Sequence, residues 1–238
     1  MFVVMDGTAV VTGAGRGIGL AFAKQLADEG YEVVGTARMP EKYEFLASGS
    51  VRALPLDVGS EDSIASFAAA LPDVISSIDL LVNCAGINSM SNAPFSKESS
   101  LLLGELEQAS LLNQLKVNTV GPVLLVQELL PMLADGARVL NVSSWLGSIG
   151  IKKSGGNYGY AASKAALNMM NRALAGDLRE RGVISVVMNP GWVRTNMGGE
   201  KAKLSPEESV SGMLRTVRAA TLEDSGAFLQ WDGSEHTW

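Results

Sequence analysis

Strand-like and helix-like segments alternate along the whole chain, and this alternation constrains the fold more than any other feature. Short runs rich in Val, Ile, Leu and Thr are followed by stretches in which apolar residues recur every three or four positions. The predicted strands are 8–12, 31–37, 51–56, 78–83, 138–143, 183–189 and 227–230, and the predicted helices are 17–29, 60–75, 107–134, 158–180 and one that begins at Pro206. The alternation predicts a doubly wound α/β fold, with a parallel sheet of about seven strands and helices on both faces.

A single Rossmann-type domain is predicted over residues 1–238, because the sequence holds no internal repeat, low-complexity tract or linker. In an open parallel sheet, ligands bind outside the carboxyl ends of the strands. The functional residues are therefore expected on the loops and helices that follow the strands. A substrate loop is expected at residues 191–205.

Charge and cysteine content exclude several classes of function. The 19 basic and 25 acidic residues give a net charge of −6, which argues against binding to a nucleic-acid backbone. Apolar stretches are shorter than the roughly 20 residues of a membrane helix, and residues 1–6 lack the basic start of a secretory signal. Cys84 is the only cysteine, and a reduced thiol fits the cytoplasm. We therefore expect a cytoplasmic protein that binds neither nucleic acid nor membrane.

A glycine-rich segment follows the first predicted strand and opens the first predicted helix. It contains Gly13, Gly17 and Gly19. Glycine permits positive φ and lets a pyrophosphate approach the backbone, while a helix N-terminus supplies free N–H groups. In this strand–turn–helix context, dinucleotide binding is favoured over an ordinary tight turn.

Tyr160 and Lys164 lie four residues apart in a predicted helix, and therefore on the same helix face. A neighbouring ammonium group stabilises a phenolate, so Lys164 is expected to lower the pKa of Tyr160 toward the neutral range. The alternative interpretation is two solvated side chains, because this spacing is common by chance. The other motifs, described next, favour the functional interpretation of the Tyr160–Lys164 pair.

Four further motifs follow predicted strands or lie in the long helix: residues 83–86 (NCAG), Asn118, residues 143–144 (SS) and residues 190–195 (PGWVRT). Together with the glycine turn and the Tyr–Lys pair, they resemble the short-chain dehydrogenase/reductase family. The resemblance runs from Thr8 to Thr195 in the order and spacing typical of that family.

The resemblance implies a catalytic set. Tyr160 matches the general acid/base, and Lys164 matches the lysine that lowers its pKa and holds the nicotinamide ribose. Ser144 matches the serine that binds the substrate carbonyl, with Ser143 as the alternative. Asn118 matches the asparagine that holds a water of the proton relay; otherwise it is a helix-interior asparagine that bonds its own backbone.

The resemblance also implies a set of cofactor-binding residues. These are Gly13, Arg16, Gly17, Ile18, Gly19, Arg38, Asp57, Val58, Asn83, Ala85, Gly86, Tyr160, Lys164, Pro190, Gly191, Val193 and Thr195. Cys84 is interpreted as buried packing and not as a nucleophile, because no basic residue is expected near it. No metal site is predicted.

Charge at the end of the second predicted strand indicates which cofactor is bound. NAD enzymes place a carboxylate there for the ribose 2′-hydroxyl, whereas an arginine accommodates a 2′-phosphate. Here Ala37 takes the carboxylate position, Arg38 follows it, and Arg16 supplies a second guanidinium. NADP(H) is therefore favoured over NAD(H).

Within the family, the sequence is most similar to small carbonyl reductases of the C-factor and sniffer type. Residues 36–42, 160–168, 190–199 and 226–238 carry this likeness. It implies an NADPH-dependent reductase of a small-molecule ketone or aldehyde, with Tyr160 as the proton donor. The alternative function is a cofactor-binding signalling or regulatory protein with little turnover.

Three expectations concern regions with weaker patterns. Residues 87–106 are interpreted as a loop with a short helix, and residues 87–100, 145–157 and 196–205 are expected to line the substrate pocket. His236 is interpreted as a surface residue of the tail.

The two long predicted helices carry apolar or small residues on more than one face, which requires a second packing partner. In the resembled family these helices commonly meet their symmetry mates. A homodimer through helices 107–134 and 158–180 is therefore expected, with a tetramer as the alternative. If residues 87–106 cover the second face instead, the protein is a monomer.

Overall fold

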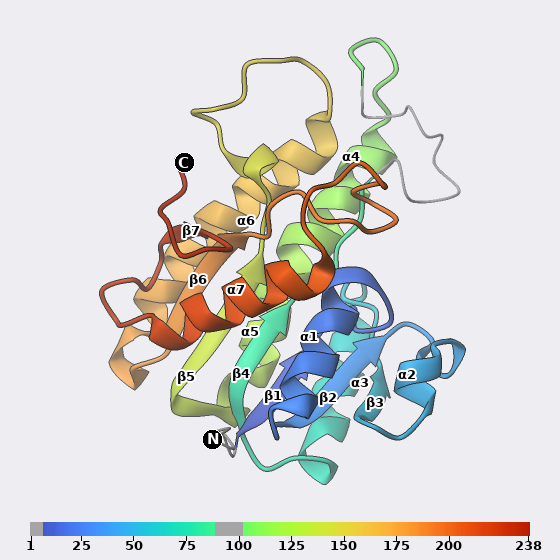
Figure 1. Cartoon of the computed structure of the whole chain (residues 1–238), viewed down its shortest axis with the longest axis vertical. Helices are drawn as coiled ribbons and strands as arrows, with labels where there is room; N and C mark the ends of the chain where they lie inside the picture. The colour runs from blue at the N-terminus through green and yellow to red at the C-terminus, as the bar shows by residue number, and fades with distance from the viewer. Residues whose placement is uncertain (1–6, 89–101) are drawn as a thin grey trace.

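The computed structural model of the protein describes residues 7–88 and 102–238 (Figure 1). Its centre is a sheet of seven strands in the order β3-β2-β1-β4-β5-β6-β7, and every neighbouring pair is parallel. The strands are β1 (Thr8–Val11), β2 (Glu32–Ala37), β3 (Arg52–Pro55), β4 (Ile78–Asn83), β5 (Leu133–Val142), β6 (Ile184–Asn189) and β7 (Phe228–Gln230). The predicted doubly wound α/β fold is confirmed.

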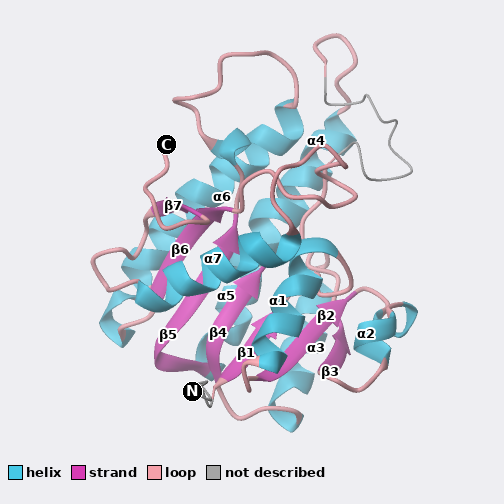
Figure 2. Ribbon diagram, in the orientation of Figure 1, coloured by secondary structure: helices cyan, strands magenta, loops and turns pink. Residues whose placement is uncertain are grey.

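Helices cover both faces of this sheet (Figure 2). They are α1 (Gly17–Asp28), α2 (Glu44–Ala47), α3 (Glu61–Ala70), α4 (Gln108–Leu115), α5 (Gly121–Leu129), α6 (Tyr158–Asp177) and α7 (Pro206–Ala219). One hydrophobic core joins α1 and α7 to the sheet, and a second joins α3 and α5 to the opposite face. The buried β4 residues alternate between the two cores, which explains the nearly continuous apolar run in that strand.

The predicted helix 107–134 is wrong as a single element. The chain forms α4, then a π-helical turn at Lys116–Val120, then α5 and a 3₁₀ turn at Leu130–Met132. Pro131 lacks the N–H that would continue the helix, and the chain is already extended at Leu133, where β5 pairs with β4. Strand β5 therefore starts earlier than the predicted strand 138–143.

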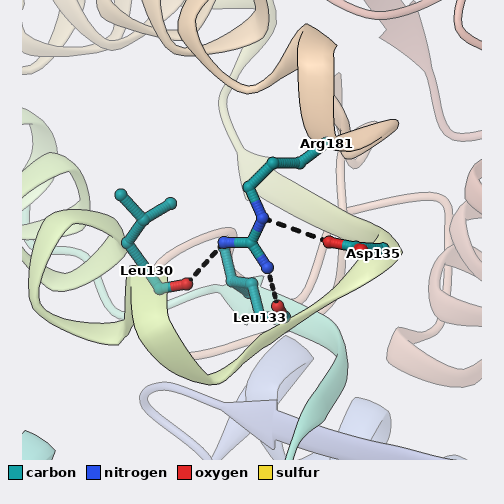
Figure 3. Close-up of polar contacts among 4 residues, drawn as sticks. All are labelled: Leu130, Leu133, Asp135 and Arg181. Carbon is teal, nitrogen blue, oxygen red and sulfur yellow. Dashed lines mark hydrogen bonds and ion pairs between the residues drawn. The ribbon is translucent and has the colours of Figure 1, made fainter.

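The end of α6 is joined to the start of β5 by Arg181 (Figure 3). Its guanidinium donates to the carbonyl oxygen of Leu130 at 2.7 Å and to that of Leu133, and pairs with Asp135 at 3.2 Å. These carbonyls lie at the junction of the 3₁₀ turn and β5, so the arginine supplies donors to backbone acceptors where helical pairing stops. The arginine lies in a 3₁₀ turn at Arg179–Arg181, because α6 ends at Asp177 and not at Glu180 as predicted.

His236 is buried, so its interpretation as a surface residue is wrong. Its ring stacks on Phe228 with centroids 4.3 Å apart, and its backbone N–H donates to the Phe228 carbonyl at 2.8 Å. The tail thus folds back on β7. This is a tertiary contact, and no local sequence pattern predicts it.

Two predicted segments lie outside the described residues in whole or in part. The N-terminal residues 1–6 are outside, and so is most of the loop and short helix predicted at 87–106, because residues 89–101 are not described.

Candidate active site and cofactor cleft

A cavity of about 960 Å³ opens at the carboxyl ends of the strands. Its wall is formed by segments that follow β1 to β6. It includes the predicted residues Gly13, Arg16, Gly17, Ile18, Gly19, Arg38, Asp57, Val58, Ala85, Gly86, Tyr160, Lys164, Pro190 and Thr195. Residues as far apart in the sequence as Gly13 and Thr195 are therefore brought to one cleft, at the sheet edge where the topology places ligands.

The glycine turn has a backbone geometry that residues with a side chain rarely adopt. Gly13 and Gly17 have φ of +69° and +58°, in the left-handed region. At Gly19 the obstacle is space, because an added Cβ would lie 2.3 Å from the Gly13 carbonyl oxygen. The turn thus presents bare backbone and the N-terminus of α1 to the cavity, an arrangement that suits a phosphate group.

We expect Gly19→Ala to destabilise the protein by about 1–3 kcal/mol, as overpacking in a rigid site does. The matched control is Gly176→Ala in α6, where an added Cβ meets no atom within 4 Å. That change should stabilise the helix by roughly 0.5–1 kcal/mol. Urea unfolding of the two variants measures the difference, and equal stability of Gly19→Ala and the wild type would contradict the steric argument.

One end of the cavity is basic. Arg16, Lys24 and Arg38 line it, and Ala37 occupies the end of β2 where a carboxylate would favour a free ribose hydroxyl. The cavity carboxylate of Asp57 accepts a hydrogen bond from the Gly59 N–H at 2.9 Å. Lys24 was not predicted from the sequence, although its position seven residues after Gly17 in the same helix would have placed it on the same face.

Tyr43 also lines this basic end and was missed by sequence analysis. Its ring lies against the glycine turn: a Cβ added to Gly15 would be 2.7 Å from the ring. No periodic pattern marks this residue, because it lies in the irregular segment between β2 and β3.

The Tyr160 phenol forms a side-chain hydrogen bond with Ser144, at the other end of the cleft. Lys164 lies one turn further along α6, and its ammonium nitrogen is 5.9 Å from the centroid of the Tyr160 ring. Lys164 also donates to the Val142 carbonyl at 2.7 Å. The Ser143 hydroxyl instead donates to Asn168 at 2.6 Å, so the geometry favours Ser144 over Ser143 as the partner of the tyrosine.

Asn118 lies in the π-helical turn, and its side chain bonds neighbouring segments and not its own helix. Its Oδ1 accepts from the Ile87 N–H at 2.8 Å, and its Nδ2 donates to the Ile87 carbonyl at 2.8 Å and to Ser163 Oγ at 2.9 Å. The side chain therefore fixes the backbone just after Gly86, beside Lys164.

Burial raises the pKa of Tyr160 to about 12, and the hydrogen bond from Ser144 offsets only part of that rise. Desolvation of the phenolate is the largest effect on this pKa, which lies above its ordinary value and not toward neutrality as expected. Burial likewise lowers the pKa of Lys164 to about 8. At neutral pH the tyrosine and the lysine both carry their protons.

Cys84 lies close enough to Lys164 for the ammonium charge to lower its pKa, which corrects the expectation that no base is nearby. Burial outweighs that charge and raises the pKa of the thiol to about 12. The thiol stays protonated, in agreement with its interpretation as a non-nucleophile.

Several predicted residues lie behind the cavity wall. The Asn83 amide donates to Asn141 Oδ1 at 2.9 Å in the core, and Val193 is buried where it pairs with Leu204. Gly191 packs beneath Leu204 and Trp231. Ser144 and Asn118 also lie outside the wall, but contact residues that line it.

Two side-chain amides that were not predicted from the sequence fix the loop around Ser144. Asn168 accepts from Ser143 and donates to the Gly147 carbonyl at 3.3 Å, while Asn189 Oδ1 accepts from the Trp145 N–H at 3.1 Å. Asn168 is found four residues after Lys164, so helical spacing could have placed it on the Tyr160–Lys164 face.

We expect the stability of the protein to depend on pH through Lys164. Its pKa is about 8 when folded and near 10.5 when exposed, so between these values the unfolded chain binds more protons. Stability should therefore rise with pH in this window, by up to about 1.4 kcal/mol per pH unit relative to Lys164→Met. Unfolding free energies of both proteins from pH 7 to pH 11 test this. Parallel pH profiles would show that the lysine titrates normally.

The model of the short chain dehydrogenase family matches residues 7–205, and the chain belongs to that family of oxidoreductases. C-signal of Myxococcus xanthus is 39% identical over 163 residues, which cover 68% of this chain and 93% of that protein.

Two solved structures superpose on nearly the whole chain. The carbonyl reductase Sniffer of D. melanogaster has a TM-score of 0.89 and 28% identity, and covers 98% of this chain and 100% of its own. The NADPH-bound carbonyl reductase from chicken fatty liver has a TM-score of 0.87 and 34% identity, with 97% and 98% covered. The predicted resemblance to C-factor and sniffer-type reductases is confirmed.

Among the described residues, no helix has the length and apolar character needed to cross a membrane. Among the same residues, no three side chains of His, Cys, Asp or Glu are grouped to hold a metal ion.

Proposed function

We propose that this protein is an NADPH-dependent carbonyl reductase that converts a small ketone or aldehyde to an alcohol. The observation that carries the proposal is a single cleft with Tyr160 and Lys164 at one end and Arg16 and Arg38 at the other. A protein that only bound the nucleotide would need the basic end and the glycine turn, but not the hydrogen-bonded Ser144–Tyr160 pair beside a buried lysine.

The cleft fits a dinucleotide with a 2′-phosphate. The bare glycine turn at the N-terminus of α1 would hold the pyrophosphate, and Arg16 and Arg38 would hold the 2′-phosphate. Lys164 would hold the nicotinamide ribose. When bound, NADPH supplies the hydride for the carbonyl carbon. The NADPH of the chicken reductase, a relative by sequence and structure, supports this choice of cofactor.

The chain's own groups supply the proton. Ser144 would hydrogen-bond the substrate oxygen and fix it beside the Tyr160 hydroxyl. Because the pKa of Tyr160 is about 12, the phenol is protonated at neutral pH and can donate to the oxygen as negative charge develops there. The Lys164 ammonium, which lies near the Tyr160 ring, would stabilise the phenolate that remains, and Asn118 would hold the water through which the proton of Tyr160 is replaced.

The proposal is tested by NADPH consumption with a panel of activated ketones and aldehydes at neutral pH. Turnover with at least one compound, faster with NADPH than with NADH, is expected. The similarity to C-signal favours the second candidate, a cofactor-binding signalling protein. Tight NADPH binding without turnover of any compound would support that candidate and contradict the reductase.

We also propose a homodimer through α4, α5 and α6. Leu112, Val120, Met169 and Met170 are apolar residues of these helices and their connecting turn, yet their side chains are exposed by 40% to 72%. Light scattering should give about twice the 25.0 kDa chain mass. Met169→Asp should shift this mass toward one chain, and a wild-type protein that is already a monomer would contradict the dimer.

A further inference from the structure

The segment 234–238 returns along the last strand of the sheet. Ser234 accepts from the Gln230 N–H at 2.7 Å, Glu235 forms an antiparallel bridge with Leu229, and His236 stacks on Phe228. The segment is therefore fixed to β7 by backbone pairing and by a buried ring.

The same segment contacts the loop 145–157, which connects Ser144 to the helix of Tyr160. The Gly150 N–H donates to the Trp238 carbonyl at 2.7 Å. A Cβ added to Gly150 would lie 2.9 Å from both the Trp238 carbonyl oxygen and the Thr237 methyl carbon. Figure 1 shows the red end of the chain beside the yellow loop that precedes α6.

The Trp238 side chain anchors this contact on α6. Its ring lies 5.5 Å from the Arg172 guanidinium and 5.5 Å from the Phe228 ring. Arg172 also donates to the Gly226 carbonyl at 3.4 Å. A cation over an indole ring contributes to stability even at a partly exposed site.

The ends of the loop are fixed by other groups. Asn189 and Asn168 hold Trp145 and Gly147 near its start, and Lys152 donates to the Gly156 carbonyl at 3.0 Å near its end. The contact of Gly150 with Trp238 lies between them. On the same part of the loop, Ile149 and Ile151 are exposed by 79% and 37%; neither residue lines the cavity of about 960 Å³.

We propose that segment 234–238 is a positioning element of the substrate pocket, which holds the middle of loop 145–157 through Gly150. The expected effect on substrate binding rests on the proposed reductase function, whereas the contact between the segment and the loop does not. Because Ser144 is fixed independently by Tyr160 and the amides, losing the segment's contact should weaken substrate binding and leave the chemical step intact.

The first test compares Trp238→Ala with Glu235→Ala, which removes an exposed side chain of the same segment. For a bulky apolar ketone, Trp238→Ala should raise KM about tenfold while kcat and the Kd of NADPH change less than about twofold, the pattern of lost uniform binding. Glu235→Ala should match the wild type, and Trp238→Phe, which keeps a ring over Arg172, should recover most of the affinity.

Gly150→Ala tests the contact from the loop side. The added methyl cannot fit beside Trp238, so KM should rise as in Trp238→Ala, whereas Gly176→Ala adds a methyl in open space and should not change KM. An unchanged KM in both Trp238→Ala and Gly150→Ala would overturn the proposal.

Limited trypsin digestion supplies a readout that does not depend on reductase activity. Lys152 and Lys153 follow Gly150 in the loop, so release of the loop should speed cleavage there several-fold in Trp238→Ala but not in Glu235→Ala. Equal cleavage rates in both variants would contradict the positioning role. If the wild type reduces no ketone but Trp238→Ala is cleaved faster, the reductase function fails while the contact stands.

Discussion

Tyr160→Phe should lose carbonyl reduction by about 10²–10⁴-fold in kcat, because it removes the only proton that the proposed acid can donate. The substitution deletes one hydroxyl and keeps the ring, so the fold and the ring's place beside Lys164 should be unchanged. Steady-state NADPH oxidation gives kcat, and quenching of intrinsic fluorescence gives the Kd of NADPH, which should stay within about threefold of wild type.

Tyr158→Phe is the matched control. Tyr158 begins the same helix and loses the same hydroxyl, but its side chain is 37% exposed and it does not line the cavity. Its activity should equal that of the wild type. Near-wild-type turnover by Tyr160→Phe would remove the phenol from the mechanism, and an equal loss in both variants would point to a general disturbance of the helix.

Arg38→Asp should reverse the preference for NADPH over NADH. It removes a charge-assisted hydrogen bond to the 2′-phosphate, worth about 1.5–3 kcal/mol, and it places a carboxylate at the end of β2. The ratio of kcat/KM for NADPH to that for NADH should fall by at least about 10- to 100-fold, and like-charge repulsion should add to this.

Lys42→Asp controls for the change of charge, because Lys42 is an exposed neighbour that does not line the cavity. Its cofactor ratio should stay near that of the wild type. A wild-type enzyme that already prefers NADH would refute the charge argument, whatever the variant does.

Local pattern and residue type were sufficient to predict the layout of the fold. The apolar run Ile78–Asn83 predicts β4 to the residue, and the Ser60 side chain caps α3 at Ser63 N as its position indicates. Irregular turns within the helices were not predicted, because the apolar periodicity does not distinguish them from regular helix. The π-helical turn at Lys116–Val120 has no signature of its own in the sequence, yet Asn118, which bonds Ile87, lies within it.

The extent to which the site's side chains are buried could not be predicted from the sequence. The residues Tyr160 and Lys164 predict a phenol activated by an ammonium, but the two pKa values depend on how much of each group is desolvated. The contact of Trp238 with Gly150 is likewise tertiary, since it joins segments 88 positions apart that carry no shared pattern.

The most direct test of the central claim is isotope transfer from NADPH deuterated at C4 of the nicotinamide. With a ketone from the active panel, one of the two C4 epimers should give an alcohol with one deuterium on the carbinol carbon, detected by mass spectrometry. The other epimer should give unlabelled alcohol. An alcohol without deuterium from both epimers, or bound NADPH that is never oxidised, would contradict a carbonyl reductase.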